Sequence, residues 1–489
     1  MHVRVLSRAS ALAVLQAALV ERALRARWPD ITVERLTRSS AGDRDPRADL
    51  RTAVEKGVFT SDLSQALLDG AADLVVHSWK DLPTAGRPGT IVAATLERAD
   101  PRDVLLVRRA VLSSQPSTVH VLSSSPRRAW QIQGSAPRLL PWPVTDVRVT
   151  AVRGNVPTRL AKLVNGDGDA LIVAKAALDR LLSDDATTET MAAVRSALDQ
   201  CRWMVLPLKE HPTAPAQGAL AVEIAAERTD LADRLGAISH GPTWEAVEYE
   251  RRILESFGGG CHEAVGATVL VRDYGLVVSI RANVGDLPSE TWSLDTPGDR
   301  PPRAAPQHVW PRPDERGRAT RRALRAPIPA EDVGLWVARA EALPVDWTVP
   351  PSRLVWTAGL RTWERLAARG VWVNGCADGL GDQERPDVET LAGHAVVWRR
   401  LTHADSGDPD ALATYVVNED VPSLAGRTHF FWTSGSAFAR ALARHPEIRD
   451  AWHASGPGRT ARTIRDTLGA GGRLSLWLDY DQWHTHVTS

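Results

Sequence analysis

The sequence predicts an α/β fold, because short apolar runs of strand length alternate with segments of helical periodicity. Several of these runs are followed directly by polar residues, as expected where ligands bind beyond the carboxyl ends of strands. The length of 489 residues exceeds what one core normally holds and indicates several domains. The first expected strands are Val3 to Leu6, Leu74 to Val76, Asp103 to Val107, Val119 to Leu122, Leu171 to Ala174 and Ala219 to Ile224.

The first helix is expected from about Ala11, because leucines recur there at helical spacing and Ser10 is a suitable N-cap. A signal peptide is not expected, since charged Glu21 and Arg22 follow the apolar stretch without a small-residue cleavage site. No stretch reaches the length of a membrane span. We therefore expect a cytoplasmic protein.

Composition excludes some partners. Lys plus Arg and Asp plus Glu both number 59, so net charge gives no reason to expect nucleic acid or membrane as a partner. The three cysteines, Cys201, Cys261 and Cys376, are far apart and lack the spacing of a disulfide framework or a metal site. No metal is expected, and a reducing compartment fits best.

The last third of the chain returns to the α/β pattern after an interruption. Residues 301–329 are rich in proline and arginine and are expected to form a linker. Residues 330–489 then form a further α/β domain, with a helix expected over Arg361 to Arg369. Its expected strands are Leu335 to Val337, Leu354 to Trp356, His429 to Trp432 and Leu474 to Trp477.

Five motifs occur in order before residue 300: His77 to Thr84 (HSWKDLPT), Ser123 to Arg128 (SSSPRR), Arg153 to Leu160 (RGNVPTRL), Pro215 to Glu223 (PAQGALAVE) and Phe257 to Gly266 (FGGGCHEAVG). Together they resemble porphobilinogen deaminase, also called hydroxymethylbilane synthase, a transferase of heme and porphyrin biosynthesis. The resemblance implies two periplasmic-binding-protein-like α/β domains and a small α+β domain that carries the cofactor cysteine. Their expected bounds are 1–98 with 202–222, 99–201, and 223–300. A monomer is expected.

The resemblance also implies the substrate, porphobilinogen, a pyrrole with two carboxylate side chains. A growing chain of such rings needs several cations, and a guanidinium matches a carboxylate through two parallel hydrogen bonds. By itself the pair Arg127 and Arg128 would be solvated surface, but three serines precede it. Substrate is expected at Arg8, Ser10, Arg153, Arg159 and Arg180, and cofactor at Ser78, Lys80, Ser123, Ser124, Ser125, Arg127, Arg128 and Arg153.

Asp81 is the expected catalytic residue. Loss of ammonia from the aminomethyl group leaves a cationic methylene-pyrrole, which a nearby carboxylate stabilises. The same group can protonate the leaving amine and take up the later ring proton. An isolated Lys80–Asp81 pair would instead be a surface turn that caps the next helix.

Cys261 is the expected attachment point of a dipyrromethane cofactor, a two-ring primer made from the enzyme's own substrate. Its thiolate can form a stable thioether, and the neighbouring glycines leave room for a bulky group. The glycines Gly258, Gly259 and Gly260 either let the loop swing as the chain lengthens or only close a tight turn. The alternative for Cys261 itself is a small buried hydrophobe beside a turn.

A lid and several departures from the family pattern complete this region. Lys56, Gly57, Val58 and Phe59 match a mobile loop over the active site, although a buried Phe59 anchoring the next helix is an alternative. None of the departures removes a group that the mechanism needs. They are Thr52, Pro126, Pro157, Ala216 and the run His262-Glu263-Ala264.

The C-terminal region carries weaker motifs. Thr433 to Ala437 and Ser455 to Ala461 look like two loops of uroporphyrinogen-III synthase, with Ser434, Ser436 and Thr460 as candidate donors to carboxylates. The region is short for a two-lobed synthase, so we expect one lobe to be reduced or missing. Two alternatives stay open: a deaminase with a non-catalytic C-terminal domain, and a non-catalytic two-domain anion-binding protein. Asp81 and Cys261 count against the latter, because a pure binder needs neither.

Overall fold

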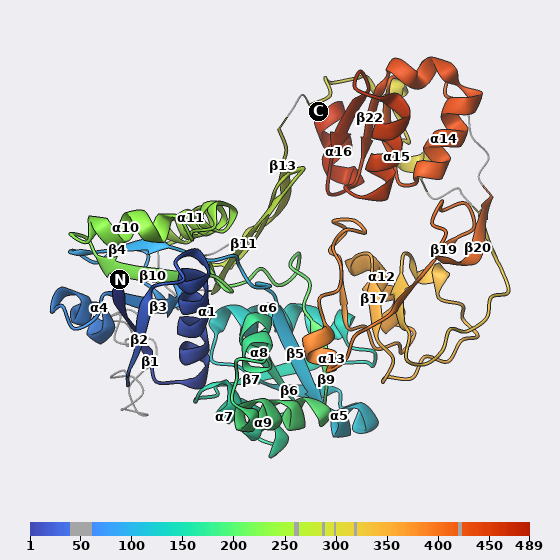
Figure 1. The fold of residues 1–489 in the computed structure, drawn as a ribbon. Helices are drawn as coiled ribbons and strands as arrows, with labels where there is room; N and C mark the ends of the chain where they lie inside the picture. Colours follow the sequence, from blue (N-terminus) through green and yellow to red (C-terminus); the bar gives the residue numbers. More distant parts are fainter. Residues whose placement is uncertain (40–60, 259–263, 286–288, 298–299, 317–319, 419–422) are drawn as a thin grey trace. The chain divides into compact units, whose positions relative to one another are not determined.

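The computed structural model describes residues 1–489 except 40–60, 259–263, 286–288, 298–299, 317–319 and 419–422 (Figure 1). The chain divides into two units. The N-terminal unit comprises Met1–Pro137, Pro143–Val271 and Ser279–Thr291, and the C-terminal unit comprises Arg138–Trp142, Arg272–Val278 and Trp292–Ser489. Sheets with helices on them occur in both units, so the expected α/β class is confirmed.

The first sheet of the N-terminal unit has five strands in the order β2-β1-β3-β10-β4. Strands β2 and β3 run parallel to β1, whereas β10 is antiparallel to both β3 and β4. Helix α1 begins after Ser10, whose side chain accepts from the Ala13 amide as predicted for an N-cap, and it packs beside β1 and β3 (Figure 1). The elements are β1 (His2–Arg8), α1 (Ala11–Arg27), β2 (Thr32–Arg38), α4 (Ser61–Leu68), β3 (Leu74–Ser78), the 3-10 turn η1 (Trp79–Asp81), β4 (Thr90–Ala94), β10 (Leu220–Ala225) and α10 (Thr229–Gly236).

The second sheet of this unit has the order β7-β6-β8-β5-β9, with β5 antiparallel to both β8 and β9. Strand β8 is fully buried, which explains why its sequence is a continuous apolar run. The elements are β5 (Asp103–Arg108), α5 (Arg109–Ser114), β6 (Thr118–Leu122), α6 (Pro126–Leu139), β7 (Asp146–Thr150), α7 (Val156–Val164), β8 (Ala170–Ala174), α8 (Lys175–Leu181), α9 (Thr188–Asp199) and β9 (Cys201–Val205).

The chain crosses between the two sheets twice, after β4 and again between β9 and β10. The second crossing starts later than the expected domain boundary, because residues 202–205 pair with β5 in the second sheet.

Glu250 fixes both crossings. Its buried carboxylate accepts two bonds from Arg98, at 2.6 and 3.0 Å, one from the Ala216 amide at 2.6 Å and one from the Val269 amide at 2.7 Å. One buried acid therefore holds both crossing segments against strand β11 (Ala264–Arg272).

A third sheet has the order β11-β12-β13. Its strands are β11 (Ala264–Arg272), β12 (Gly275–Asn283) and β13 (Ser289–Asp295), preceded by helix α11 (Gly241–Ser256). The region expected as domain 223–300 is smaller in the structure, because Leu231 and Leu235 of α10 belong to the core of the first sheet. The expectation that α10 belongs to this third region is therefore wrong, because α10 packs on the first sheet.

The C-terminal unit contains two sheets. A four-stranded parallel sheet has the order β14-β21-β22-β23, and a six-stranded sheet has the order β15-β20-β19-β16-β17-β18, parallel except for the β15–β20 pair. The first comprises β14 (Val309–Trp310), β21 (His429–Trp432), α14 (Gly435–Arg444), β22 (Trp452–Ser455), α15 (Arg459–Leu468), β23 (Arg473–Leu476) and α16 (Tyr480–Thr488). The second comprises β15 (Thr320–Ala323), β16 (Gly334–Val337), β17 (Val355–Thr357), α12 (Leu360–Ala367), β18 (Gly375–Cys376), α13 (Glu389–Ala392), β19 (Trp398–His403) and β20 (Leu412–Asn418). The short 3-10 turns are η2 (Pro306–His308), η3 (Pro313–Glu315), η4 (Ala340–Ala342) and η5 (Pro446–Asp450).

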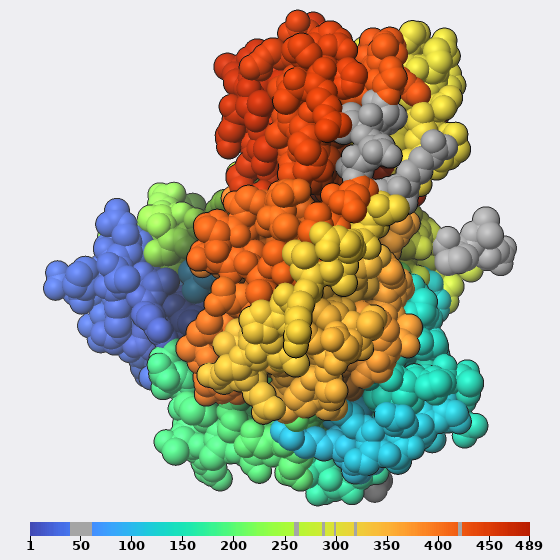
Figure 2. All heavy atoms as spheres, turned by 90° about the vertical axis from the view of Figure 1, so that its right-hand side faces the viewer, coloured from blue at the N-terminus to red at the C-terminus, as the bar shows by residue number. Residues whose placement is uncertain are grey.

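Two expectations about this region change. Residues 301–329 are more than a linker, because they supply β14 to one sheet and β15 to the other. In Figure 2 the yellow residues of this segment lie against the red C-terminal ones, as the β14–β21 pairing requires. The C-terminal region also has two sheets, whereas we expected one lobe to be reduced or missing. Backbone pairing across long sequence separations created both features, and composition does not reveal it.

Among the residues that the structure describes, no helix is both long and apolar enough to cross a membrane.

Candidate functional site

The predicted catalytic acid lies on the turn η1, directly after the buried strand β3. Trp79 anchors this turn: its ring packs edge-on against Trp244 with centroids 5.1 Å apart, and its amide donates to the Ala219 carbonyl. Asp81 follows at the end of the turn and is exposed, so solvent and ligands can reach its carboxylate. A buried aromatic side chain thus fixes the backbone that presents an accessible acid.

Lys80 lies between the anchor and the acid and is half-buried. Its Nζ donates to Oε1 of Gln217 at 3.2 Å. Burial lowers the pKa of Lys80 to about 8, with Arg128 acting in the same direction and the charge of Asp81 opposing them. At neutral pH the side chain is a cation that loses its charge in the mildly alkaline range.

Gln217 orients this region through both ends of its amide. Its Nε2 donates to the Pro101 carbonyl at 2.7 Å and to Oδ1 of Asp103 at 2.8 Å. This leaves Oε1 as an acceptor for Lys80 and, at 3.3 Å, for Arg128. Gln217 lies in the motif Pro215 to Glu223 on the second crossing. The sequence did not predict its role, because its hydrogen-bond partners come from three separate segments of the chain.

Arg127 and Arg128 are buried and paired with Asp103. Both Nε and Nη2 of Arg128 bond to this carboxylate, at 3.1 and 2.6 Å, and Arg127 reaches it at 2.9 Å. Arg127 also donates to Gln131 and to the Pro212 carbonyl. Burial would raise the pKa of Asp103, but the charges of Arg128 and Arg127 outweigh it and hold this pKa far below its usual range. An internal acid therefore binds both arginines, and their role in holding the cofactor stays a prediction.

The signal for Asp103 was present in the sequence. The residue begins β5, a strand that is otherwise apolar, and it is completely buried. A lone carboxylate at such a position requires cationic partners, and the only adjacent arginine pair in a motif lies at the start of α6.

The three serines before Arg127 shape the loop between β6 and α6. Ser124 donates to the Val152 carbonyl at 2.6 Å and accepts from the Val152 amide at 3.0 Å, which ties this loop to the one after β7. Ser123 accepts from the Ser125 amide, and Ser125 accepts from the Arg128 amide in the first helical turn. The hydroxyl groups of Ser123, Ser124 and Ser125 thus bond to the backbone of these loops.

The other predicted cations come from separate elements. Arg159, on α7, donates to the Gly154 carbonyl; burial lowers its pKa, Arg128 adds to the effect, and Asp81 opposes it. The charges of Arg128 and Asp81 therefore both act on Arg159. Arg180, on α8, donates to the Gly218 carbonyl at 2.7 Å, and burial lowers its pKa to about 10.

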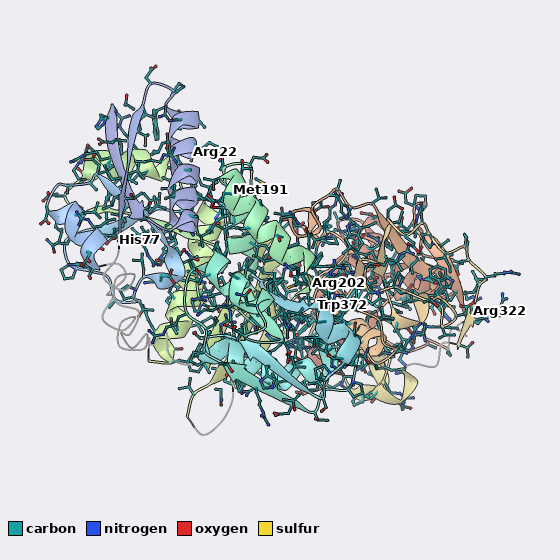
Figure 3. All side chains as sticks on the ribbon, turned by 90° about the horizontal axis from the view of Figure 1, so that it is seen from below. Arg22, His77, Met191, Arg202, Arg322 and Trp372 are labelled. Atoms are coloured by element: carbon teal, nitrogen blue, oxygen red, sulfur yellow. The ribbon has the colours of Figure 1, made fainter. Side chains whose placement is uncertain are left out.

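The remaining predicted residues have varied surroundings. Arg8 ends β1, and Arg153 is exposed in the loop before α7. Ser10 caps α1, and Ser78 accepts from the buried Gln16 at 2.8 Å. His77, labelled in Figure 3, bonds to the buried Glu223 at 2.9 Å, which gives its ring a local structural partner.

The structure accounts for three of the departures from the family pattern. Pro126 and Pro157 stand in the first turns of α6 and α7, where a missing amide hydrogen breaks no helical bond. Ala216 adopts a left-handed backbone with φ +64°, which glycine tolerates better, and its amide bond to Glu250 holds it there.

Several predictions lie outside the described residues: Cys261, His262 and Glu263, together with Thr52 and the lid residues Lys56, Gly57, Val58 and Phe59. Along the chain, Cys261 falls between the end of α11 and the start of β11. The described residues contain no cluster of side chains suited to hold a metal ion.

The C-terminal candidates lie at strand ends. Ser434 caps α14, and its hydroxyl lies 2.9 Å from that of Ser436, which in turn lies 3.2 Å from Nε2 of His403 on the other sheet. Thr460 is in the first turn of α15. These hydroxyl groups connect the two sheets of the C-terminal unit.

In the N-terminal unit an exposed carboxylate, Asp81, is adjacent to the cation Lys80. Buried ion pairs hold α6 to β5 and α11 to the first crossing segment. An accessible acid beside a cation is an arrangement that suits a protein binding an acidic small molecule. Residues 3–233 match the family model described as porphobilinogen deaminase, dipyromethane cofactor binding domain.

Curated relatives extend the match. The porphobilinogen deaminase of Moorella thermoacetica is 36% identical over 280 residues, which cover 57% of this chain and 82% of the relative. That of Lachnospira eligens is 34% identical over 278 residues, covering 56% and 86%, and that of Mycobacterium ulcerans is 40% identical over 266 residues, covering 54% and 76%. The chain belongs to the porphobilinogen deaminase family, transferases of porphyrin biosynthesis whose cofactor is dipyrromethane. The resemblance of the C-terminal region to uroporphyrinogen-III synthase stays a prediction.

Proposed function

We propose that the N-terminal unit joins four porphobilinogen units into hydroxymethylbilane, using Asp81 as the proton-transfer residue. The observation that carries this proposal is an exposed carboxylate on a rigid turn beside the cation Lys80, with Arg159 electrostatically coupled to it. Substrate carboxylates need such cations, and developing positive charge needs such a carboxylate.

The residues present fit a dipyrromethane group. Its acidic side chains suit Lys80, Arg153 and Arg159, and Cys261 would hold it through a thioether. When bound, the group supplies the pyrrole end to which new rings are added.

The buried arginines have a different part in this proposal. Arg127 positions the loop, because Asp103, Gln131 and the Pro212 carbonyl already engage it. Arg128 contributes its positive charge to the site while Asp103 holds it in place. Ser123, Ser124 and Ser125 keep the loop in the shape that exposes the ligand-facing groups, and Arg8, Ser10 and Arg180 line the substrate path.

Asp81 has three tasks in the proposed reaction. It gives a proton to the amine as the carbon–nitrogen bond of the substrate breaks and ammonia leaves, and its carboxylate then stabilises the cationic methylene-pyrrole. After the new carbon–carbon bond forms, it takes the ring proton, which restores the acid for the next cycle.

Asp81→Asn tests this role, with Asp146→Asn as a matched exposed control on β7. The first variant should lose about 10² to 10⁴-fold in kcat while folding normally, and the control should keep the rate. Intact mass of the denatured protein beside Cys261→Ser should show an excess of two condensed porphobilinogen units only when Cys261 is present. A full-rate Asp81→Asn, or a bare mass after incubation with porphobilinogen, contradicts the proposal.

For the C-terminal unit we propose uroporphyrinogen-III synthase activity. The support is the pair of parallel sheets whose end loops carry Ser434, Ser436 and Thr460. Hydroxymethylbilane closes spontaneously to the wrong isomer, so tethering a second enzyme raises its effective concentration at the point of release. The test is the isomer composition of the product. Full-length protein that yields only the spontaneous isomer would favour a non-catalytic C-terminal unit.

A further inference from the structure

Five charged side chains form a network between the two sheets of the C-terminal unit. We call this the arginine network: Arg400, Arg459, Arg462, Asp382 and Asp408. Three guanidinium groups face two carboxylates, so the network has one net positive charge. Arg459 lies in the motif Ser455 to Ala461, the other four residues lie in no motif, and the proposed deaminase chemistry uses none of the five.

The network is built around carboxylate recognition. Arg462 holds both oxygens of Asp382, at 2.7 and 2.8 Å. Arg459 binds Asp408 at 2.9 Å, and Arg400 reaches Asp408 at 3.0 Å and Asp382 at 3.3 Å. The pKa of Asp382 is lowered despite its burial, because Arg462 and Arg400 stabilise the charged form. The arginines are therefore already arranged to receive two carboxylates.

The network lies where α/β sheets bind ligands. Asp382 and Asp408 follow the carboxyl ends of β18 and β19, and Arg459 and Arg462 follow that of β22. The two arginines also belong to the first turn of α15, whose N-cap, Gly458, offers no side-chain bond to the amides. Both the position in the fold and the local charge favour an anion.

Two loops of the network contact each other closely through glycines. A Cβ placed on Gly381 would lie 2.8 Å from the Cα of Gly458, and both glycines have positive φ, at +107° and +105°. Close backbone contact of this kind requires glycine on both sides. It joins the loop that carries Asp382 to the loop that carries the arginines.

The internal ion pairs are accessible to exchange. The side chains of Arg459 and Arg462 are 36% and 37% exposed, and that of Arg400 is 25% exposed. Water screens pairs at this level of exposure, so an external carboxylate can compete with the aspartates.

We infer that Arg400, Arg459 and Arg462 form a binding site for a polycarboxylate, and that Asp382 and Asp408 occupy this site in the free chain. A ligand with several carboxylates displaces the aspartates one at a time and bridges the two sheets in their place. This deepens the proposed function of the C-terminal unit, whose substrate would carry eight carboxylates, but it requires binding alone and no ring closure.

The test is titration of the full-length protein with uroporphyrin I, a stable octacarboxylate, at fixed low ionic strength. Arg462→Gln should weaken binding at the C-terminal site about tenfold or more, because a bidentate charged contact is lost. Asp382→Asn should tighten it several-fold, because an internal competitor is removed. Arg322→Gln is the matched control, because Arg322 is an exposed arginine of β15 in the same unit (Figure 3). Binding by the N-terminal unit is common to all variants.

The opposite signs of the two effects separate a binding site from a structural network. If Asp382→Asn weakens binding as much as Arg462→Gln, or if neither changes it, the inference is wrong. If Arg462→Gln does not fold, Arg459→Gln carries the same test, because it leaves the Asp382–Arg462 pair intact. Inorganic phosphate that competes as well as uroporphyrin I would overturn the assignment to carboxylates. Binding that follows these signs without any control of the product isomer would keep this inference and remove the synthase proposal.

Discussion

The two units use the same pair of residue types, arginine and aspartate, at different depths. In the N-terminal unit Asp103 is fully buried and its partners Arg127 and Arg128 are 3% and 8% exposed. In the C-terminal unit the partners of Asp382 are about a third exposed or slightly less. A buried pair cannot be separated without leaving an uncompensated charge, whereas an exposed pair can exchange with solvent or ligand.

Depth therefore decides function. The bonds of Asp103 and Glu250 hold the two crossing segments against β5 and α11, near Gln217 and its partner Lys80. The more exposed pairs of the arginine network are those that, in the inference above, a ligand carboxylate replaces.

The largest expected effect is on the buried side of this comparison. Asp103→Ala should lower the free energy of unfolding of the N-terminal unit by about 3–5 kcal/mol, because it leaves two buried guanidinium groups unpaired. Asp146→Ala is the matched control, since the Asp146 and Arg148 side chains are 50% and 67% exposed and such a pair is worth about 1 kcal/mol or less. Urea unfolding followed by tryptophan fluorescence measures both. Equal losses for the two variants would mean that depth does not control the strength of these pairs.

Most of the N-terminal fold could be predicted from local sequence. Apolar periodicity and capping alone predict strand β1, helix α1 with its cap Ser10, and strand β3. The engagement of Arg127 and Arg128 by Asp103 could not be predicted this way, because the start of α6 meets the start of β5 only in the tertiary fold. Sequence showed which side chains were charged, and the tertiary fold decided which charges were already neutralised.

An intermediate effect is expected for Lys80, whose side chain is neither fully buried nor fully exposed. Its pKa of about 8 means that, from about pH 7 to about pH 9, its charged fraction falls about tenfold. The KM for porphobilinogen should rise over this range, since a carboxylate loses its cation. Lys80→Arg, which stays charged, should flatten the profile. A KM that is flat in the parent protein would show that Lys80 does not contact substrate.

The lowered pKa of Lys80 has the opposite consequence for stability: substrate binding weakens as pH rises, but the folded state gains stability. The folded pKa lies below the ordinary value of 10.5, so the unfolded chain binds the proton more tightly. The contribution of Lys80 to the free energy of unfolding should therefore rise with pH between about 8 and 10.5. Binding and stability changing in opposite directions would identify a lysine whose burial serves the ligand.

The C-terminal fold was less predictable. The strands at Leu335 and His429 were clear from their apolar residues, yet β14 and β15 lie in a proline- and arginine-rich stretch. Strands of two and four residues carry almost no periodic signal, and their pairing with β21 and β20 is purely non-local. The arginine network could not be predicted for the same reason, because its members span 80 residues of sequence and meet only in the tertiary fold.

The smallest expected effect is on the exposed side. Asp382→Asn should lower the free energy of unfolding of the C-terminal unit by about 1 kcal/mol or less, because its arginine partners remain solvated when the charge is removed. High salt should remove most of the difference, since exposed pairs are screened. Urea unfolding at low and high salt, with Arg322→Gln as the control, measures this. A loss as large as that of Asp103→Ala, unchanged by salt, would place the arginine network in the same structural class as the buried pairs, and ligand carboxylates could not then displace Asp382.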